Sequence, residues 1–449
     1  MDVGCAYLNA RRVGLPPIFM PLSKELATEL VEMEPSFADA VREDGSMMVE
    51  LIGGLYGLIE SGWLWYHNIA DFLISLGFIV CDSDNCLFLK EEIKIALYVD
   101  DLFVVAKDFR HIEELHILLL KKYGEVKLNE GPIHTFLGME LDLTERGRPR
   151  VSINLSDLLS EVKGRTETPA GMNLFAIDDS PPLDYDSAAR FHSIVAKLLW
   201  IAKRSRPDIL LPVNFLCTRV RAPTETDLNK LNRILKYLNG TKDYQMELGM
   251  IVNDDGTLNL DVYIDASYAV HEDSKSHTGV LATIGKGCIY AVSSKQACVS
   301  KSSTEAELIA YTDYIGEAME LKNIVQDVTQ RETKLIIHQD NQSTMSIVEN
   351  GKVSGKSKHT SKHVKVRVAW LKERSDLGDF STKYCPSEKM KSDGMTKPKG
   401  WDSFETFRSF TGVRDHHITK ERAEISGYRG DEWVEGNLKG DAAESEDSD

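Results

Sequence analysis

The run IALYVDDLFVV, residues 95–105, decides the fold of the first part of the chain. Apolar and aromatic side chains fill it, except at the central pair Asp100 and Asp101. Because β-branched and aromatic residues favour strands and aspartate is accepted in tight turns, the run predicts two strands that meet at an acidic tip. Residues 112–123 follow with leucine and isoleucine at helical spacing, which predicts a helix.

The pattern changes twice further along the chain. Helical periodicity appears over residues 191–202 and 224–238. From about residue 251 the pattern predicts three strands, a helix over 303–328, a strand over 335–338 and a further helix. We therefore expect a multidomain protein of the α+β and α/β classes. The expected parts are an opening sheet domain, a helical part, a mixed-sheet domain and an acidic, disordered tail: 1–145, 146–250, 251–400 and 401–449.

Composition excludes several classes of protein. Of the 449 residues, 42% are hydrophobic and 27% are charged, which is ordinary for a globular protein. No stretch approaches the roughly 20 apolar residues of a membrane helix, and the N-terminus does not resemble a secretory signal. The seven cysteines are scattered without a CxxC pair, which argues against zinc and disulfide frameworks. We expect an intracellular protein with no membrane partner.

Charge is unevenly distributed. The net charge of −17 argues against nucleic-acid binding when it is taken alone. However, residues 431–449 hold eight acids and one base, whereas residues 351–374 hold eight Lys or Arg and one acid. A basic stretch beside acidic clusters is typical of a nuclease or polymerase, which gathers carboxylates at its active site and meets phosphate at its flanks. A solvated loop and helix face is the alternative interpretation.

The first carboxylate cluster is the acidic tip. Phosphoryl transfer by two metal ions needs several carboxylates that converge on Mg²⁺ ions about 3.5–4 Å apart. Hard oxygen ligands suit Mg²⁺, and Asp100 and Asp101 are placed to supply them. A plain turn between two strands is the alternative.

A second cluster is spread over the later part of the chain. Asp265 ends a predicted strand, Glu307 begins a helix, Asp340 follows a strand and Asp393 lies in a loop. These four acids converge if the three elements pack side by side. Each acid also has a structural alternative. Thr304 with Glu307 matches a capping box, and the Asp-Asn and Asp-Gly pairs at residues 340 and 393 match turns.

Several segments resemble a known family. LYVDDLFVVAKD at 97–108 resembles the YVDD hairpin of reverse transcriptases, and MDVGCAYLNA at 1–10 resembles the strand with the other palm aspartate. Four further segments are similar to copia-type LTR retrotransposon Pol polyproteins and follow in the same order: LYGLIESGWLWY at 55–66, FLGMELD at 136–142, FHSIVAKLLWIAKRSRPDI at 191–209 and LNKLNRILKYLNGT at 228–241. The resemblance covers about residues 1–400.

The resemblance implies a reverse transcriptase palm over 1–145 and a thumb or connection over 146–250. Asp2 would join Asp100 and Asp101 as a catalytic metal ligand, and Tyr7 would contact the incoming nucleotide. Two departures weaken this polymerase. The family's fingers precede the first motif and are not in this chain, and Glu60 replaces a glutamine, so that it would repel a triphosphate. We expect little or no polymerase activity.

The later segments resemble the copia-type ribonuclease H, which assigns residues 251–400. They are YIDASYAVHEDSKSHTGV at 263–280, SSKQACVSKSSTEAELIA at 293–310, HQDNQSTMSI at 338–347, TSKHVKVRVAWLKE at 360–373 and SDGMTKP at 392–398. By position, the implied catalytic metal ligands are Asp265, Glu307, Asp340 and Asp393. Two positions depart from the family, Lys365 and Ala369, where Asp and His are usual.

The implied activity is hydrolysis of the RNA strand of an RNA–DNA hybrid, with two Mg²⁺ ions expected at each active site. The expected partners are RNA, DNA and their hybrid, with deoxynucleoside triphosphates only if the polymerase is competent. His363 is also a candidate proton shuttle, and a histidine packed against the basic loop is the alternative. The location would be a cytoplasmic virus-like particle or the nucleus. An inactive remnant that binds nucleic acid is the alternative. The implied nucleic-acid contacts are Lys358, Lys362, His363, Lys365 and Arg367.

Overall fold

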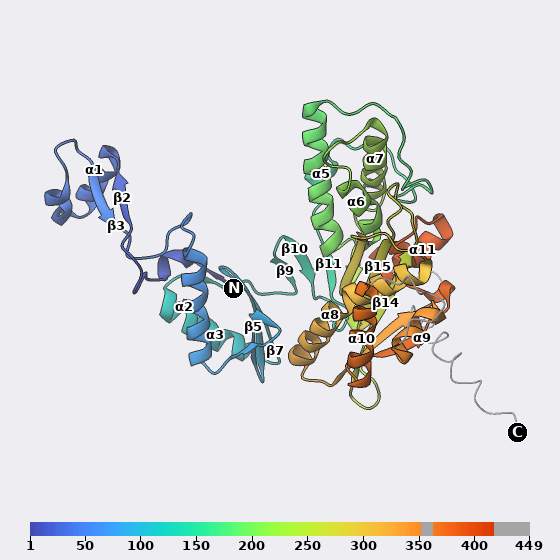
Figure 1. The fold of residues 1–449 in the computed structure, drawn as a ribbon. Helices are drawn as coiled ribbons and strands as arrows, with labels where there is room; N and C mark the ends of the chain where they lie inside the picture. Colours follow the sequence, from blue (N-terminus) through green and yellow to red (C-terminus); the bar gives the residue numbers. More distant parts are fainter. Residues whose placement is uncertain (352–361, 417–449) are drawn as a thin grey trace, which may run out of the picture. The chain divides into compact units, whose positions relative to one another are not determined.

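The computed structural model describes residues 1–351 and 362–416, without the side chains of residues 362–364. The chain forms two compact units that divide after Gly131 (Figure 1). The sequence placed the first boundary after residue 145 instead. The difference arises because residues 133–142 form a hairpin, β9 and β10, whose second strand pairs with β11 of the second unit.

The first unit holds a six-stranded antiparallel sheet in the order β4-β5-β6-β7-β1-β8. Its strands are β1 (Asp2–Val3), β4 (Ile79–Cys81), β5 (Asp84–Lys90), β6 (Ile93–Tyr98), β7 (Asp101–Ala106) and β8 (Val126–Lys127). The helices are α1 (Lys24–Met33), α2 (Ser61–Ser75) and α3 (Phe109–Tyr123), and β2 (Phe19–Leu22) and β3 (Met47–Glu50) form a separate hairpin. The predicted acidic hairpin and the helix after it are confirmed.

The core of the first unit lies between its sheet and two helices. Trp65 and Leu73 of α2, Ile95 of β6 and Leu119 of α3 are buried together. Apolar residues alternate along β6, as expected for a strand that buries one face. The strands of the hairpin that carries Asp100 and Asp101 therefore pack on this core.

The second unit is built on a mixed five-stranded sheet in the order β17-β15-β14-β18-β19. Its strands are β14 (Leu258–Ser267), β15 (His277–Thr283), β17 (Tyr290–Lys295), β18 (Thr333–Gln339) and β19 (Ser381–Tyr384). β14 pairs antiparallel with β15 and parallel with β18. The parallel pair needs a crossover, which the long helix α8 (Ser303–Thr329) supplies.

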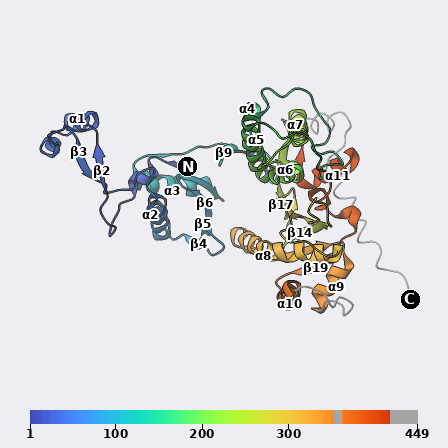
Figure 2. The ribbon, with the colours of Figure 1, turned by 45° about the horizontal axis from the view of Figure 1, so that its top comes forward.

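Helices cover both faces of this sheet (Figure 2). On one face, Leu260, Val262 and Ile264 pack against α8. On the other, Tyr263 and Leu281 pack against the helical segment that precedes the sheet. The remaining helices are α4 (Ser156–Leu159), α5 (Tyr185–Arg204), α6 (Leu210–Cys217), α7 (Glu225–Gly240), α9 (Gln342–Asn350), α10 (Lys362–Asp376) and α11 (Trp401–Thr411).

A smaller antiparallel sheet in the order β20-β12-β11-β10-β9 completes the unit. Its strands are β9 (Ile133–Phe136), β10 (Met139–Asp142), β11 (Arg150–Ser152), β12 (Gln245–Glu247) and β20 (Val413–Arg414), and β13 (Gly249–Met250) pairs with β16 (Gly285–Lys286).

The prediction of disorder from residue 401 onward is wrong for residues 401–414. They form α11 and β20, and Phe404 packs edge-on against Tyr237 of α7 with ring centroids 5.5 Å apart. Phe404 and Phe407 are spaced for one helix face, and the acidic composition farther on obscured that signal. The acidic end, 417–449, lies outside the described residues.

Candidate active site

Asp265 lies near the carboxyl end of β14, in the middle of the sheet. Its side chain is buried, with 3% of it exposed. Thr396 Oγ1 donates a hydrogen bond to its Oδ2. Burying a carboxylate costs free energy unless a partner or a metal ion compensates its charge, so we expect such a partner or ion beside Asp265.

Glu307 reaches Asp265 from α8. Its Oε1 accepts the backbone N–H of Ala266 at 3.1 Å, and its Oε2 accepts the side-chain amide of Gln339 at 3.3 Å. The alternative interpretation of Glu307 as part of a capping box is wrong. The helix is capped two residues earlier, where the Ser302 hydroxyl accepts the N–H of Glu305 and the Glu305 carboxylate accepts the N–H of Lys301.

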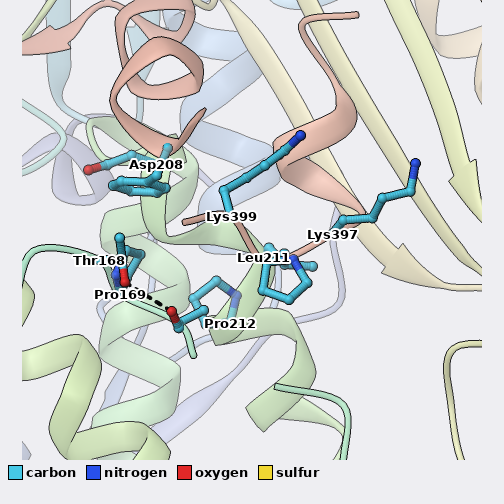
Figure 3. A pocket seen from close by; sticks show the side chains of 11 residues that line it. Thr168, Pro169, Asp208, Leu211, Pro212, Lys397 and Lys399 are labelled. Carbon is cyan, nitrogen blue, oxygen red and sulfur yellow. Dashed lines mark hydrogen bonds between the residues drawn. The ribbon is translucent and has the colours of Figure 1, made fainter. Parts of the chain in front are cut away.

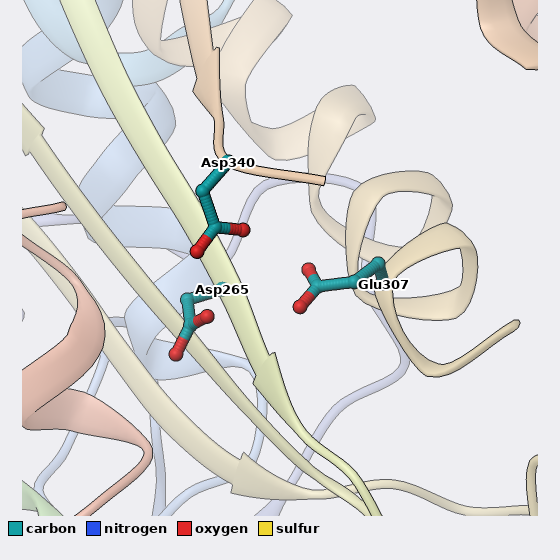
Figure 4. Close-up of side chains that lie close together, drawn as sticks. All are labelled: Asp265, Glu307 and Asp340. Carbon is teal, nitrogen blue, oxygen red and sulfur yellow. The ribbon is translucent and has the colours of Figure 1, made fainter. Parts of the chain in front are cut away.

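Asp340 directly follows β18. Because β14 and β18 run parallel, their carboxyl ends meet at one edge of the sheet. Asn341 caps α9, and the Asp340 Oδ2 accepts the Ser387 hydroxyl at 2.9 Å. Figure 4 shows the carboxylates of Asp265, Glu307 and Asp340 grouped together, each from a different element.

These three carboxylates form the acid triad. One ligand oxygen from each lies within 4.8 Å of the others. Within residues 1–351 and 362–416, no other group of three His, Cys, Asp or Glu side chains meets that condition. Oxygen ligands at this spacing suit a hard divalent cation. The donor set therefore fits Mg²⁺.

The electrostatics of the triad support the same conclusion. Burial raises the pKa of Glu307 well above its usual range, and the charges of Asp265 and Asp340 raise it further. Burial also raises the pKa of Asp265, and the nearby Lys397 opposes that shift. Like charges that are buried together favour a proton or a metal ion.

Asp393 lies beside the triad but is not one of its members. It opens a 3₁₀ turn, η5 (Asp393–Met395), and its Oδ1 accepts the Lys397 ammonium at 2.7 Å. Lys399 contacts its other oxygen. Burial works to raise the pKa of Asp393, but the hydrogen bonds from the two lysines prevail and hold it below its usual value.

A buried chain of hydrogen bonds holds the turn that carries Asp393. The Ser293 hydroxyl donates to the carbonyl of Met395 at 2.8 Å, so the His277 Nε2–H must donate to Ser293 Oγ at 2.7 Å. His277 Nδ1 is then left to accept from His271 Nε2 at 3.0 Å. Burial lowers the pKa of His277 to about 3 and that of His271 to about 4. Both rings are therefore neutral near neutral pH. The sequence interpretation missed these residues and Thr396, because none belongs to a local catalytic pattern.

The predicted nucleic-acid contacts are only partly described. Lys358 and the side chains of Lys362 and His363 lie outside the described residues. Lys365 is exposed on α10. Arg367 instead faces α8, where it donates to Asp313 Oδ1 at 2.7 Å.

The first cluster is looser than the triad. Asp2 on β1 lies opposite Asp101 on β7, and the Val3 N–H donates to the Asp100 carbonyl at 3.0 Å. Burial raises the pKa of Asp101, and the charges of Asp100 and Asp2 add to the shift. Asp2, Asp100 and Asp101 thus gather at one tip, without the ligand spacing of the triad.

Two aromatic rings lie beside this tip, and an ion pair compensates the charge of Glu60. The centroids of the Tyr7 and Tyr56 rings lie 4.8 Å apart. Burial raises the pKa of the Tyr56 hydroxyl, and the charges of Asp100 and Asp2 raise it further. The Glu60 carboxylate pairs with Arg12 at 2.9 Å. The charge expected to repel a triphosphate is therefore compensated within the chain.

The fold and site define a mixed helix-and-sheet protein with an acid triad of metal-ligand spacing, two of whose members are buried. No helix in the described part of the chain is long and apolar enough to cross a membrane. Residues 19–166 match the family described as reverse transcriptase (RNA-dependent DNA polymerase). Over most of its length the chain is similar to copia-type retrotransposon Pol polyproteins, as its motifs indicated.

Three relatives support this assignment. The retrovirus-related Pol polyprotein from transposon RE1 of Arabidopsis thaliana is 28% identical over 84% of this chain and 26% of its own length. That from transposon TNT 1-94 of Nicotiana tabacum is 27% identical over 86% of this chain and 30% of its own length. A putative transposon Ty5-1 protein of Saccharomyces cerevisiae is 29% identical over 71% of this chain and all of its own length. The chain thus spans less than a third of the two plant relatives.

Proposed function

We propose that the second unit hydrolyses the RNA strand of RNA–DNA hybrids at the acid triad. The observation that carries this proposal is the spacing of Asp265, Glu307 and Asp340, whose ligand oxygens lie within 4.8 Å of one another. Two of these acids are buried, and burial, together with the charges of neighbouring carboxylates, raises their pKa values; a divalent cation would compensate these charges. The retrotransposon relationship and the motifs at 263–280 and 392–398 support the same chemistry.

In this mechanism the protein holds and orients the reacting groups. Bound Mg²⁺ would supply an activated water and neutralise charge on the scissile phosphate. Asp265, Glu307 and Asp340 would hold the ion; the first two side chains are buried, and that of Asp340 is half-buried. The Ala266 N–H and the Gln339 amide orient Glu307, and Ser387 orients Asp340. Asp393 is the fourth ligand that the family resemblance implies.

The test is Mg²⁺-dependent cleavage of labelled RNA in an RNA–DNA hybrid by the full chain. Asp340→Asn is expected to lower the cleavage rate at least about a hundredfold, because it removes a ligand charge and leaves the shape unchanged. Asp255→Asn is the matched control, since Asp255 is an exposed acid that contacts Lys334 and Thr257. Cleavage by Asp340→Asn at the parent's rate would refute the site.

A second candidate function, RNA-directed DNA synthesis, belongs to the first unit. It is favoured by Asp2 facing Asp101 across β1 and β7 and by the match of residues 19–166 to the reverse transcriptase family. We expect it to be the weaker activity, because the acids there lack the spacing of the triad. Its partners would be a primer–template and deoxynucleoside triphosphates. Robust primer extension by the purified chain would contradict this ranking.

The remaining candidate is an inactive remnant that only binds nucleic acid. It predicts hybrid binding without cleavage at any Mg²⁺ concentration. Measuring binding and cleavage on the same labelled hybrid therefore separates it from the nuclease.

A further inference from the structure

Lys397 bridges two carboxylates of the acidic site. Its Nζ lies 2.7 Å from Asp393 Oδ1 and 3.7 Å from Asp265 Oδ2. Lys399 contacts the second oxygen of Asp393. A protein ammonium group therefore already lies between the acid triad and the fourth acid, where a second divalent ion would have to bind.

This pairing differs from a surface ion pair. The Asp265 side chain is 3% exposed, and that of Asp393 is 19% exposed, so water screens their charges poorly. The Lys397 side chain is 49% exposed and reaches the acids from the solvent side. The buried acids keep Lys397 charged, because they raise its pKa even though burial works to lower it. The lysine thus acts as a fixed cation whose side chain can still turn away.

The backbone of the lysine segment is held in place. Thr396 is tied to Asp265, and the segment 397–399 packs against Pro169, Leu211 and Pro212 in a small pocket (Figure 3). Figure 3 shows the Lys397 and Lys399 side chains extending from this anchored segment. Only the side chains, and not the loop, need to move for the two lysines to leave Asp393.

An open cavity gives the lysines somewhere to turn. It has a volume of about 530 Å³ and is lined by Lys397 and Lys399 together with Met172, Phe175 and Val270. Apolar and aromatic walls beside two ammonium groups suit a nucleotide, because a base can pack on the wall while the phosphate meets the lysines. The phosphates of a nucleic-acid strand that enters this cavity would compete with Asp393 for both lysines.

We infer that Lys397 is an internal cation of the acidic site, so that without nucleic acid the chain takes up one divalent ion where a Lys397→Gln variant takes up two. The inference rests on the metal site of the proposed function. With Lys397 beside it, a second ion meets a like charge within a few ångströms and lacks the free carboxylate of Asp393. Replacing the ammonium by a neutral amide removes the like charge between the acids and frees Asp393 Oδ1, while Lys399 still contacts the other oxygen. The phosphate of a bound strand would do the same by drawing the lysines away.

The experiment is Mn²⁺ titration of the full chain by calorimetry, together with electron paramagnetic resonance of the bound ion. All samples carry Asp100→Asn and Asp101→Asn, which disable the other acidic tip. We expect one ion for the parent and two spin-coupled ions for Lys397→Gln, with the second site at least about tenfold tighter than in the parent. Lys397→Arg keeps the charge and is expected to bind one ion. Lys334→Gln removes a surface lysine and is also expected to bind one.

The outcomes separate this inference from the proposed function. If the parent and Lys397→Gln both bind two coupled ions, or both bind one, the lysine does not limit the site, while the metal site itself stands. If Lys397→Arg binds two ions, the charge argument is overturned. The proposed function fails as well if the parent binds no ion, or if Asp340→Asn binds the same ions as the parent. Thermal unfolding of each variant in EDTA checks that the variants are folded.

Discussion

The carboxylate of Glu307 accepts a hydrogen bond of 3.1 Å from the backbone N–H of Ala266, the residue directly after Asp265. This contact ties the first turns of α8 to the middle strand of the sheet. Because α8 also forms the crossover between β14 and β18, the acids of all three elements are positioned together. The acid triad is thus part of the packed fold, and changes in the fold around it should alter both stability and chemistry.

Neutralising Glu307 should stabilise the metal-free protein. Glu307→Gln keeps an oxygen that can accept the Ala266 N–H, and it removes a buried charge that burial and two carboxylates disfavour. In EDTA near pH 8 we expect the free energy of unfolding to rise by roughly 0.5–2 kcal/mol, as is common when a functional site is relaxed. In Mg²⁺ the variant should lose the stabilisation that the parent gains from the ion. Chemical denaturation with and without Mg²⁺ measures both effects.

The same substitution should change the pH dependence. The pKa of Glu307 is raised in the folded state, so its contribution to stability is complete below the unfolded value of 4.5 and is lost as pH rises through the raised folded value. The advantage of Glu307→Gln over the parent should therefore grow as pH increases above about 4.5. A constant or shrinking difference between the two unfolding curves would contradict the assigned burial of this acid.

Gly279 should not tolerate a side chain. It pairs with Asp265 across β14 and β15, and a Cβ there would lie 2.6 Å from Thr396 and 2.7 Å from Met395. Gly279→Ala would push away the turn that carries Asp393, at a cost of about 1–3 kcal/mol, and hybrid cleavage should fall at least about tenfold. Gly316→Ala is the control. It lies in α8 with nothing within 4 Å of its Cβ, and should stabilise the helix by roughly 0.5–1 kcal/mol.

Arg206 should be essential for the helical part of the second unit. Its guanidinium is buried, pairs with Asp208 at 2.8 Å and donates to the Thr241 carbonyl at 3.0 Å, while Tyr237 donates to the same aspartate at 2.6 Å. Arg206→Met would leave Asp208 buried without its partner, at a cost of about 3–5 kcal/mol. Thermal or urea unfolding measures the loss.

Lys107→Met is the matched control for that change. It breaks an exposed ion pair with Glu92 and should alter stability by no more than about 0.5 kcal/mol. Equal effects of the two substitutions would show that burial does not decide the strength of these pairs.

Trp65 should hold the acidic tip of the first unit. Its indole N–H donates to the carbonyl of Val99 at 2.5 Å, and Val99 has a φ of 54°, which a β-branched residue rarely adopts. Trp65→Phe leaves that carbonyl without this donor and should cost about 1–3 kcal/mol. Hydrogen exchange at the amides of residues 99–102 should speed up. Trp63→Phe, at a ring that is 58% exposed, should leave both measurements nearly unchanged.

Much of the local structure could be predicted from the sequence. The apolar and aromatic run of residues 95–105 and the helical spacing of 112–123 correspond to β6, β7 and α3, because strands favour β-branched and aromatic residues and burying one helix face imposes a period on the sequence. Local rules failed where two signals overlapped. Ser302 and Thr304 both begin a capping pattern, and only packing decides that the helix starts at the first of them. At residues 401–414, the acidic composition farther along the chain outweighed the two buried phenylalanines.

The sequence by itself indicated the family and predicted which residues serve as metal ligands: Asp265, Glu307, Asp340 and Asp393. Only the tertiary structure decided how these acids differ. Three of them converge because parallel strands end at one edge and α8 crosses beside them. Asp393 is instead held by Lys397 and Lys399, because a turn packed against Gly279 brings those lysines to it. Electrostatic energy depends on distance and burial, and neither can be read from spacing along the chain.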